Sequence, residues 1–285
     1  MVNVCILGAT SHVAQGLIYH FKRNDDFKLY LFARTLNYLP YDRFDCFQYD
    51  IIINCIGFGT FKDDFDYNSV FAVTEYYDDL IIKYLKKNKT CKYIYFSTGG
   101  IHRSIDIDNI SKDDIHTITR INSEAKHRMN KDLSIINLRL YSYFSRWAQI
   151  HRDNYFMNQL IKSLITDKVF ITDENEFTRD FIHPEDLFGI ILKCMSFENT
   201  NCSFEIGSSQ YVTKFAILNY FVEQYGLKIY YDIITHNSLT GKKVEYHPIN
   251  KSTLFKSKYT SIETVIMESR YFLNEKNDSN NSGIL

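Results

Sequence analysis

An apolar segment near the start of the chain, VNVCILG (2–8), ends in a glycine and leads directly into a helical pattern, VAQGLIYHFKRN (13–24). A short apolar run of this kind is typical of a strand that is buried on both faces of a parallel sheet. Strand and helix patterns then alternate, with strands expected at 28–34, 49–57, 92–98 and 133–142 and helices at 70–88 and 111–131. This alternation predicts an α/β fold built on a doubly wound parallel sheet.

The interval from Arg34 to Tyr49 is shorter than the roughly 30 residues of a complete strand–helix–strand unit, so we expect a trimmed crossover there. Beyond about 145 the pattern becomes irregular. We therefore predict a Rossmann-type dinucleotide-binding domain and a small C-terminal α/β substrate-binding lobe, with the active site in the cleft between them. The expected boundaries are 1–144 for the first domain, 145–274 for the lobe, 177–195 for a segment returning toward the first domain, and 275–285 for a disordered tail.

The composition argues against several classes of protein. A formal net charge of -1 gives no indication of binding to nucleic acid or to a membrane surface. No apolar run approaches the roughly 18–20 residues that a membrane span needs. The six cysteines form no C-x-x-C pair, so we expect reduced thiols in a cytoplasmic protein and no metal site. The abundance of Ile, Asn, Lys, Tyr and Phe indicates AT-biased coding and a bacterial source.

The loop GATSHVA (8–14) separates the first strand from the first helix. A helix N-terminus in this position offers free N–H groups and a positive dipole to a pyrophosphate. Ser11 and Ala14 replace the second and third glycines of the pattern G-x-x-G-x-x-G. We predict that this loop binds a nicotinamide dinucleotide through Gly8, Thr10, Ser11, His12 and Val13.

Arg34 follows the second strand, where an acidic residue would hold the adenosine ribose of NAD. A guanidinium suits a 2′-phosphate instead. The sequence therefore favours NADP(H), and NAD(H) remains the alternative.

Several linked segments resemble the extended short-chain dehydrogenase/reductase family of the NAD-dependent epimerase/dehydratase type, in its nucleotide-sugar branch. GATSHVAQG is similar to the GATGFIG loop, and YIYFST to the strand that ends in the catalytic Ser/Thr. INLRLYSYFS resembles the strand and turn under the nicotinamide. TRDFIHPEDL resembles the family's RDFIHVDD segment, and FEIGSSQYVT its FNIGSGE segment. The resemblance covers nearly the whole chain.

The resemblance implies functions for several residues. Thr98 takes the place of the catalytic Ser/Thr, whose hydroxyl bonds the reacting oxygen. Cofactor contacts are implied at the ends of the third and fourth strands, and substrate contacts in the second lobe. The cofactor residues are Ile56, Gly57 and Ser97. The substrate residues are Arg179 and His183, with Tyr246, Arg146 and Arg152 as weaker candidates.

The stretch HTITRINSEAKHR (116–128) lies where the family has its catalytic Tyr-x-x-x-Lys pair. Two alignments are open. His116 and Arg120 replace both residues but keep Glu124 at the family's Glu, whereas Asn122 and Lys126 keep only the Lys. We favour the first alignment, because its surroundings and its spacing to the next strand fit the family better.

The favoured alignment changes the chemistry of the pair. Arg120 can hold ribose hydroxyls but cannot lose a proton at a useful pH. His116 titrates near neutrality and can protonate an alkoxide. The alternative is that this helix has lost catalysis and that His116 is an exposed helix residue.

Family members that dehydrate a sugar carry Asp-Glu after the catalytic Ser/Thr, whereas this chain has Gly99 and Gly100, which disfavours a dehydratase. We predict an NADP(H)-dependent reductase of a 4-keto nucleotide sugar in bacterial capsule or surface-polysaccharide synthesis, with a homodimer as the candidate assembly. One alternative is a nucleotide-sugar 4-epimerase with bound NAD. The other is a non-catalytic dinucleotide-binding sensor or complex subunit.

Overall fold

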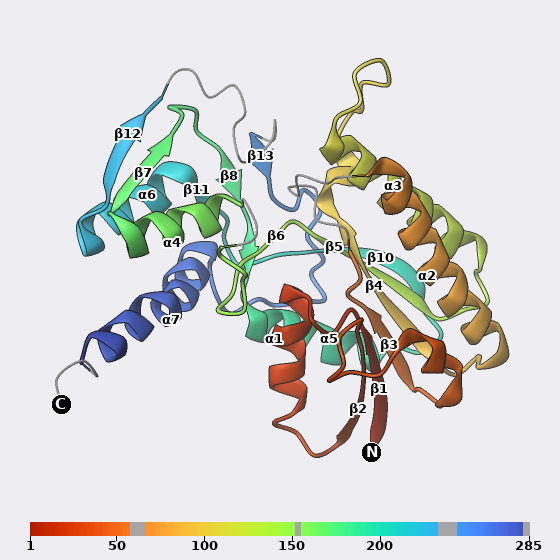
Figure 1. Cartoon of the computed structure of the whole chain (residues 1–285). Helices are drawn as coiled ribbons and strands as arrows, with labels where there is room; N and C mark the ends of the chain where they lie inside the picture. The colour runs from red at the N-terminus through yellow and green to blue at the C-terminus, as the bar shows by residue number, and fades with distance from the viewer. Residues whose placement is uncertain (58–65, 152–154, 233–243, 282–285) are drawn as a thin grey trace.

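The computed structural model describes residues 1–57, 66–151, 155–232 and 244–281. Its centre is a six-stranded sheet in which every neighbouring pair is parallel, in the order β10-β5-β4-β3-β1-β2 (Figure 1). The strands are β1 (Val2–Leu7), β2 (Phe27–Phe32), β3 (Ile51–Asn54), β4 (Lys92–Thr98), β5 (Ile135–Leu140) and β10 (Asn201–Ile206). This architecture confirms the predicted α/β fold with a parallel sheet.

The crossover between β2 and β3 is trimmed, as the short interval predicts. A single 3-10 helix, η1 (Tyr41–Cys46), occupies it, and β2 is left as the edge strand. The chain continues from β2 to β3 on the other side of β1. The direction of winding therefore reverses between β1 and β3, and in doubly wound sheets ligands bind at the carboxyl ends of the strands at such a point.

Two helical layers cover the sheet. Helices α1 (His12–Phe21) and α5 (Pro184–Met195) pack side by side on one face, and α2 (Tyr67–Lys87) and α3 (Lys112–Met129) on the other (Figure 1). Alternate strand residues point to opposite layers, so Ile53 packs in the core with α1 and α5 and Ile52 in the core with α2. Both strand faces are therefore buried, which explains the continuous apolar runs in the sequence.

A second lobe lies beside the carboxyl ends of the central strands, on the left of Figure 1. Its core is shared by α4 (Phe156–Thr166), α6 (Lys214–Tyr225) and α7 (Ser261–Asn281), with β7 (Val169–Thr172) paired to β12 (Lys228–Tyr231). A small sheet, in the order β11-β8-β13, completes it. The remaining short elements are β11 (Val212–Thr213), β8 (Thr178–Arg179), β13 (Glu245–Tyr246), β6 (Ser142–Tyr143), β9 (Phe181–Ile182) and the 3-10 helix η2 (Gly99–His102).

Two boundaries differ from the expected ones. The segment 177–195 does supply α5, but the chain then continues into β10, so the central sheet takes residues as far as Ile206. Helix α7 runs to Asn281, past the expected start of a disordered tail at 275. Its first half is anchored by buried residues such as Val265, and extending an existing helix is far easier than starting one. Within the described residues, no helix is both long and apolar enough to span a bilayer.

One buried carboxylate connects the lobe to the first domain. Glu268 of α7 accepts hydrogen bonds from the Arg146 backbone N at 2.7 Å, from Arg146 Nε at 3.0 Å and from Arg146 Nη2 at 2.6 Å. Its Oε1 also lies 3.4 Å from Nε2 of His183, the N-cap of α5. Burial opposes ionisation, but the bonds from His183 and Arg146 outweigh it and lower the pKa of Glu268 to about 2.

We expect the Glu268→Gln variant to be less stable than the wild type above pH 5 and to approach it in acid. The lowered pKa contributes stability that is fully present above the ordinary glutamate value and is lost as pH falls toward 2. At pH 7 the lowered pKa contributes up to about 3 kcal/mol to the free energy of unfolding. Urea unfolding at pH 7 and at lower pH measures it. The exposed Glu223→Gln on α6 is the matched control. Equal stability of Glu268→Gln and wild type at pH 7 would contradict the assignment.

Candidate active site

The loop after β1 has a backbone that only glycine fits. Gly8 has φ 74°, and a Cβ there would lie 2.9 Å from the backbone of Cys55 and Ile56 at the end of β3. Ser11 then caps α1, with its Oγ accepting from Ala14 N at 3.3 Å. The N–H groups of His12 and Val13, the first two residues of the helix, have no carbonyl partner within the helix, so they are available to an anion. These features fit the pyrophosphate of a dinucleotide.

Two loop residues differ in exposure. Thr10 is exposed, whereas His12 is half-buried and its ring packs against that of Tyr143, with 4.8 Å between the ring centres. Burial lowers the pKa of His12 to about 4, so its imidazole is neutral at pH 7. Within the described part of the chain, His12 Nε2 has no hydrogen-bond partner. The ring of His12 therefore packs against β6, and a cofactor contact from His12 would come from its backbone.

Arg34 is exposed beyond the end of β2. The hydroxyl of Tyr41, on η1, accepts from Gly8 N at 3.2 Å, and its ring lies 4.9 Å from that of Tyr77. Burial raises the pKa of Tyr41 to about 12, and the positive charge of Arg34 acts against that rise. Tyr41 therefore borders the glycine loop through its bond with Gly8. Sequence reasoning missed Tyr41, because it lies in the trimmed crossover and no local pattern connects it to Gly8.

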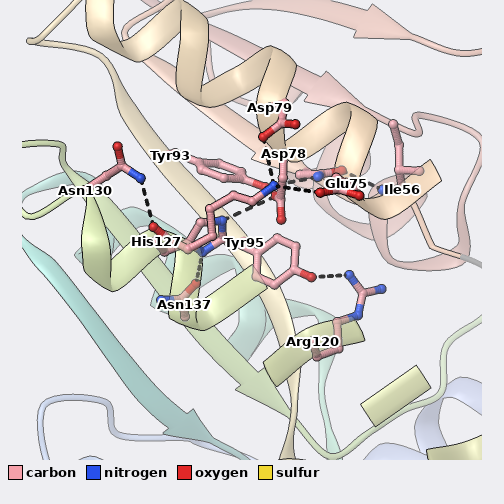
Figure 2. A network of polar contacts seen from close by, with 12 residues as sticks. Ile56, Glu75, Asp78, Asp79, Tyr93, Tyr95, Arg120, His127, Asn130 and Asn137 are labelled. Atoms are coloured by element: carbon pink, nitrogen blue, oxygen red, sulfur yellow. Dashed lines mark hydrogen bonds and ion pairs between the residues drawn. The ribbon is translucent and has the colours of Figure 1, made fainter. Parts of the chain in front are cut away.

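Ser111 is the N-cap of helix α3 and forms a capping box with Asp114. Figure 2 shows the guanidinium of Arg120 directed at Tyr95, and its Nη1 donates to the Tyr95 hydroxyl at 2.6 Å. A Cβ on Gly57 would lie 3.5 Å from Arg120 Nη2. Burial disfavours the charge on Arg120, but the contacts with Tyr95 outweigh it and raise its pKa. Arg120 thus reaches the end of β3, next to the glycine loop.

The competing lysine points elsewhere. Lys126 Nζ lies 2.8 Å from Asp79 Oδ1 and 3.9 Å from Glu75 Oε1, and both carboxylates belong to α2. Lys126 therefore bridges two helices on the outer layer. The geometry supports the alignment through Arg120, and a ribose contact from Arg120 stays a prediction. His116 lies half-buried, one turn before Arg120, and its part in catalysis also stays a prediction.

Thr98, at the end of β4, contacts the second lobe. Its Oγ1 lies 2.7 Å from the hydroxyl of Tyr246 on β13, and it accepts from Gly100 N at 3.2 Å. A Cβ at Gly99 would lie 2.2 Å from the ring of Tyr141. Tyr141 thus fills the space next to Thr98 where a side chain at 99 would be, which explains physically why no acidic group follows Thr98.

The other predicted residues fall into two groups. Arg179 lies beside Tyr246, with its guanidinium carbon 5.9 Å from that ring centre. His183 is buried, and its Nδ1 accepts from Glu185 N at 3.2 Å as a helix cap. Ser97 donates to the buried Glu124 at 2.6 Å. Arg152 lies outside the described residues. The structure therefore brings Thr98, Tyr246 and Arg179 together and places His183 with Glu268, away from this group of contacts.

No protein-family model matches the sequence, and neither does any curated protein. Solved structures do match in fold. The UDP-glucose 4-epimerase of Thermotoga maritima, with UDP-glucose, is 13% identical over 96% of this chain and 99% of that chain, with a TM-score of 0.77. The UDP-glucuronic acid 4-epimerase of Bacillus cereus, with UDP-glucuronic acid and NAD, is 15% identical over 96% and 100%, with a TM-score of 0.74.

The dTDP-glucose 4,6-dehydratase of Bacillus anthracis, in complex with NAD, is 12% identical over 97% of this chain and 98% of that chain, with a TM-score of 0.74. The chain therefore has the fold of nucleotide-sugar epimerases and dehydratases. This is the fold that its resemblance to the extended short-chain dehydrogenases/reductases predicts.

We expect Arg120→Ala to weaken NADPH binding about tenfold or more, since a hydrogen bond to a charged group contributes about 1.5–3 kcal/mol. Lys126→Ala is the matched control on the same helix and should bind NADPH like the wild type. Fluorescence titration measures both affinities, and thermal unfolding checks that each variant is folded. A loss of affinity in Lys126→Ala with none in Arg120→Ala would show that the other alignment is correct.

Proposed function

We propose that the protein is an NADP(H)-dependent reductase of a 4-keto nucleotide sugar. The observation that carries this proposal is the hydroxyl of Thr98 at the end of β4, in a site where the ring of Tyr141 excludes a side chain at Gly99. A hydroxyl there can bind a keto oxygen and stabilise its developing negative charge. Eliminating water would instead need an acid and a base beside Thr98. The dehydratase among the similar structures is therefore a relative in fold, and we do not assign its reaction to this chain.

Different residues would bind different parts of the cofactor. Gly8, Ser11, Val13 and the backbone of His12 hold the pyrophosphate, and Arg120 holds the nicotinamide ribose. When bound, the reduced nicotinamide supplies a hydride to the keto carbon. Further cofactor contacts come from Thr10 and from the ends of β3 and β4, at Ile56, Gly57 and Ser97.

Thr98 polarises the keto oxygen, which must also receive a proton. The sequence assigns that proton to His116, and Arg179 lies close enough to Tyr246 to contact the sugar or its phosphates. We place this enzyme in the cytoplasm and its product in bacterial surface-polysaccharide synthesis, with a homodimer as the candidate assembly.

A 4-epimerase with bound NAD is the second candidate, because two of the similar solved structures are nucleotide-sugar 4-epimerases. An epimerase must remove a proton and later return it, and it has to retain its cofactor. The replacement of the family's Tyr and Lys by His116 and Arg120 argues against that cycle. The third candidate, a dinucleotide-binding sensor, would keep the glycine loop and lose turnover.

One assay separates the three functions. Purified protein is mixed with NADPH and a panel of 4-keto nucleotide sugars, and separately with UDP-glucose without added cofactor. We expect NADPH oxidation with at least one keto sugar. Conversion of UDP-glucose to its 4-epimer would instead support the epimerase. Tight NADPH binding without any turnover would support the sensor and contradict the reductase.

Arg34 should determine the choice of cofactor. We expect the wild type to bind NADPH more tightly than NADH, because the Arg34 guanidinium can pair with the 2′-phosphate. Arg34→Ala should lose this preference through weaker NADPH binding, with NADH affinity unchanged. Titration with both cofactors measures the ratio, and Arg43→Ala on the nearby η1 is the control. Equal or tighter NADH binding by the wild type would contradict the assignment of Arg34.

A further inference from the structure

We propose that Tyr246, and not His116, donates the proton to the keto oxygen in this site. The inference rests on the proposed reductase function and assigns one of its steps to a residue of the second lobe. Tyr246 is far along the sequence from the helix that carries the family's tyrosine, yet its hydroxyl is 2.7 Å from Thr98 Oγ1. It thereby restores a pair of hydroxyls where the sequence of α3 has lost one.

The two hydroxyls can bind the same oxygen. Thr98 is bound on its other side by Gly100 N at 3.2 Å, which restricts the direction in which its Oγ1 can point. An oxygen that accepts from Thr98 on the side of Tyr246 is within hydrogen-bond reach of both hydroxyls, because these are 2.7 Å apart. Both side chains are buried, with 5% of Thr98 and 8% of Tyr246 exposed. Hydrogen bonds to a developing negative charge are strongest in such surroundings.

The backbone around Tyr246 is held by the sheet of the lobe. Strand β13 pairs with β8, where Tyr246 is opposite Arg179. The carbonyl of Tyr246 accepts from Asp180 N at 3.2 Å. Its ring packs against that of Tyr141, with 5.0 Å between centres. The hydroxyl is therefore presented by an ordered ring and does not depend on an exposed, mobile side chain.

A buried carboxylate of the central sheet fixes the same region from the other side. Glu205 of β10 accepts from Ile249 N and from Asn250 N, each at 2.9 Å, just after β13. The same Oε2 accepts from the Tyr141 hydroxyl at 2.9 Å. Glu205 thus positions both the segment that follows Tyr246 and the ring on which Tyr246 packs.

The proposed step balances. As hydride reaches the keto carbon from NADPH, the carbonyl π electrons move to the oxygen. The O–H bond of Tyr246 breaks, and its proton forms the new O–H bond of the product alcohol. The electron pair left on the Tyr246 oxygen is stabilised by the Thr98 hydroxyl and by the nearby charge of Arg179, and water returns the proton after product release.

The test compares Tyr246→Phe, which keeps the ring, with Tyr230→Phe on the exposed strand β12. Single-turnover NADPH oxidation is followed with the keto sugar that the wild type reduces. Removal of a general acid typically lowers the rate about 10²–10⁴-fold, and we expect Tyr246→Phe to fall in that range. Tyr230→Phe should match the wild type. A smaller loss in Tyr246→Phe than in His116→Ala would overturn the proposal in favour of His116.

A binding measurement tests the contact between Tyr246 and the sugar independently of turnover. Calorimetry measures the affinities for UDP and for UDP-glucose, and their ratio gives the contribution of the sugar to binding. We expect Tyr246→Phe to reduce this sugar contribution and to leave the UDP affinity unchanged. If the wild type oxidises NADPH with no sugar of the panel, the reductase function fails, and this measurement still tests the contact. An identical sugar contribution in Tyr246→Phe and wild type would show that Tyr246 does not touch the sugar and would overturn the proposal.

Discussion

The placement of helix α3, and with it the direction of Arg120, depends on the buried carboxylate of Glu124. It accepts from Ser97 Oγ at 2.6 Å, from Arg139 Nε at 3.0 Å and Nη2 at 2.8 Å, and from Ser203 Oγ at 3.0 Å. Burial opposes its charge, but these bonds outweigh burial and lower its pKa. Breaking such a buried pair typically costs about 3–5 kcal/mol, so α3 cannot rotate about its axis without losing it. Arg120, one turn earlier, is thereby directed at the ends of β3 and β4.

A chain of hydrogen bonds connects helix α3 to the end of β3, next to the glycine loop. His127 Nε2 lies 3.3 Å from Asp78 Oδ1, and the Tyr93 hydroxyl donates to that oxygen at 2.9 Å (Figure 2). Asn54 Nδ2 donates to the Tyr93 oxygen at 3.1 Å, and Asn54 Oδ1 accepts from Ile56 N at 3.0 Å. The backbone at the end of β3, against which Gly8 packs, is therefore fixed from the interior of α2 and α3. Buried polar groups that are satisfied in this way favour one arrangement of the layers.

The sequence was sufficient to predict the parts of the molecule that depend on neighbours in the chain. Buried strands, the trimmed crossover before β3 and the glycine loop all follow from local patterns. The contact between Thr98 and Tyr246 could not be predicted in this way, because it joins β4 to a two-residue strand whose pairing is set by the distant β8. The burial of His183 against Glu268 could not be predicted from the sequence for the same reason. Local patterns determine elements, whereas such contacts arise only when two domains meet.

The contact between the two domains brings two hydroxyl groups together. Thr98 belongs to the central sheet and Tyr246 to the lobe, so a hydroxyl pair exists only while β13 lies against the end of β4. Glu205 supports this arrangement from β10, a strand that the chain adds to the central sheet only after building half of the lobe. In the extended short-chain dehydrogenase/reductase family, which the sequence resembles, the acid lies on the same domain as the Ser/Thr. Moving the acid to the lobe that is expected to hold the sugar would couple proton donation to the contact between the two domains, and helix α3 would then need only to bind the cofactor.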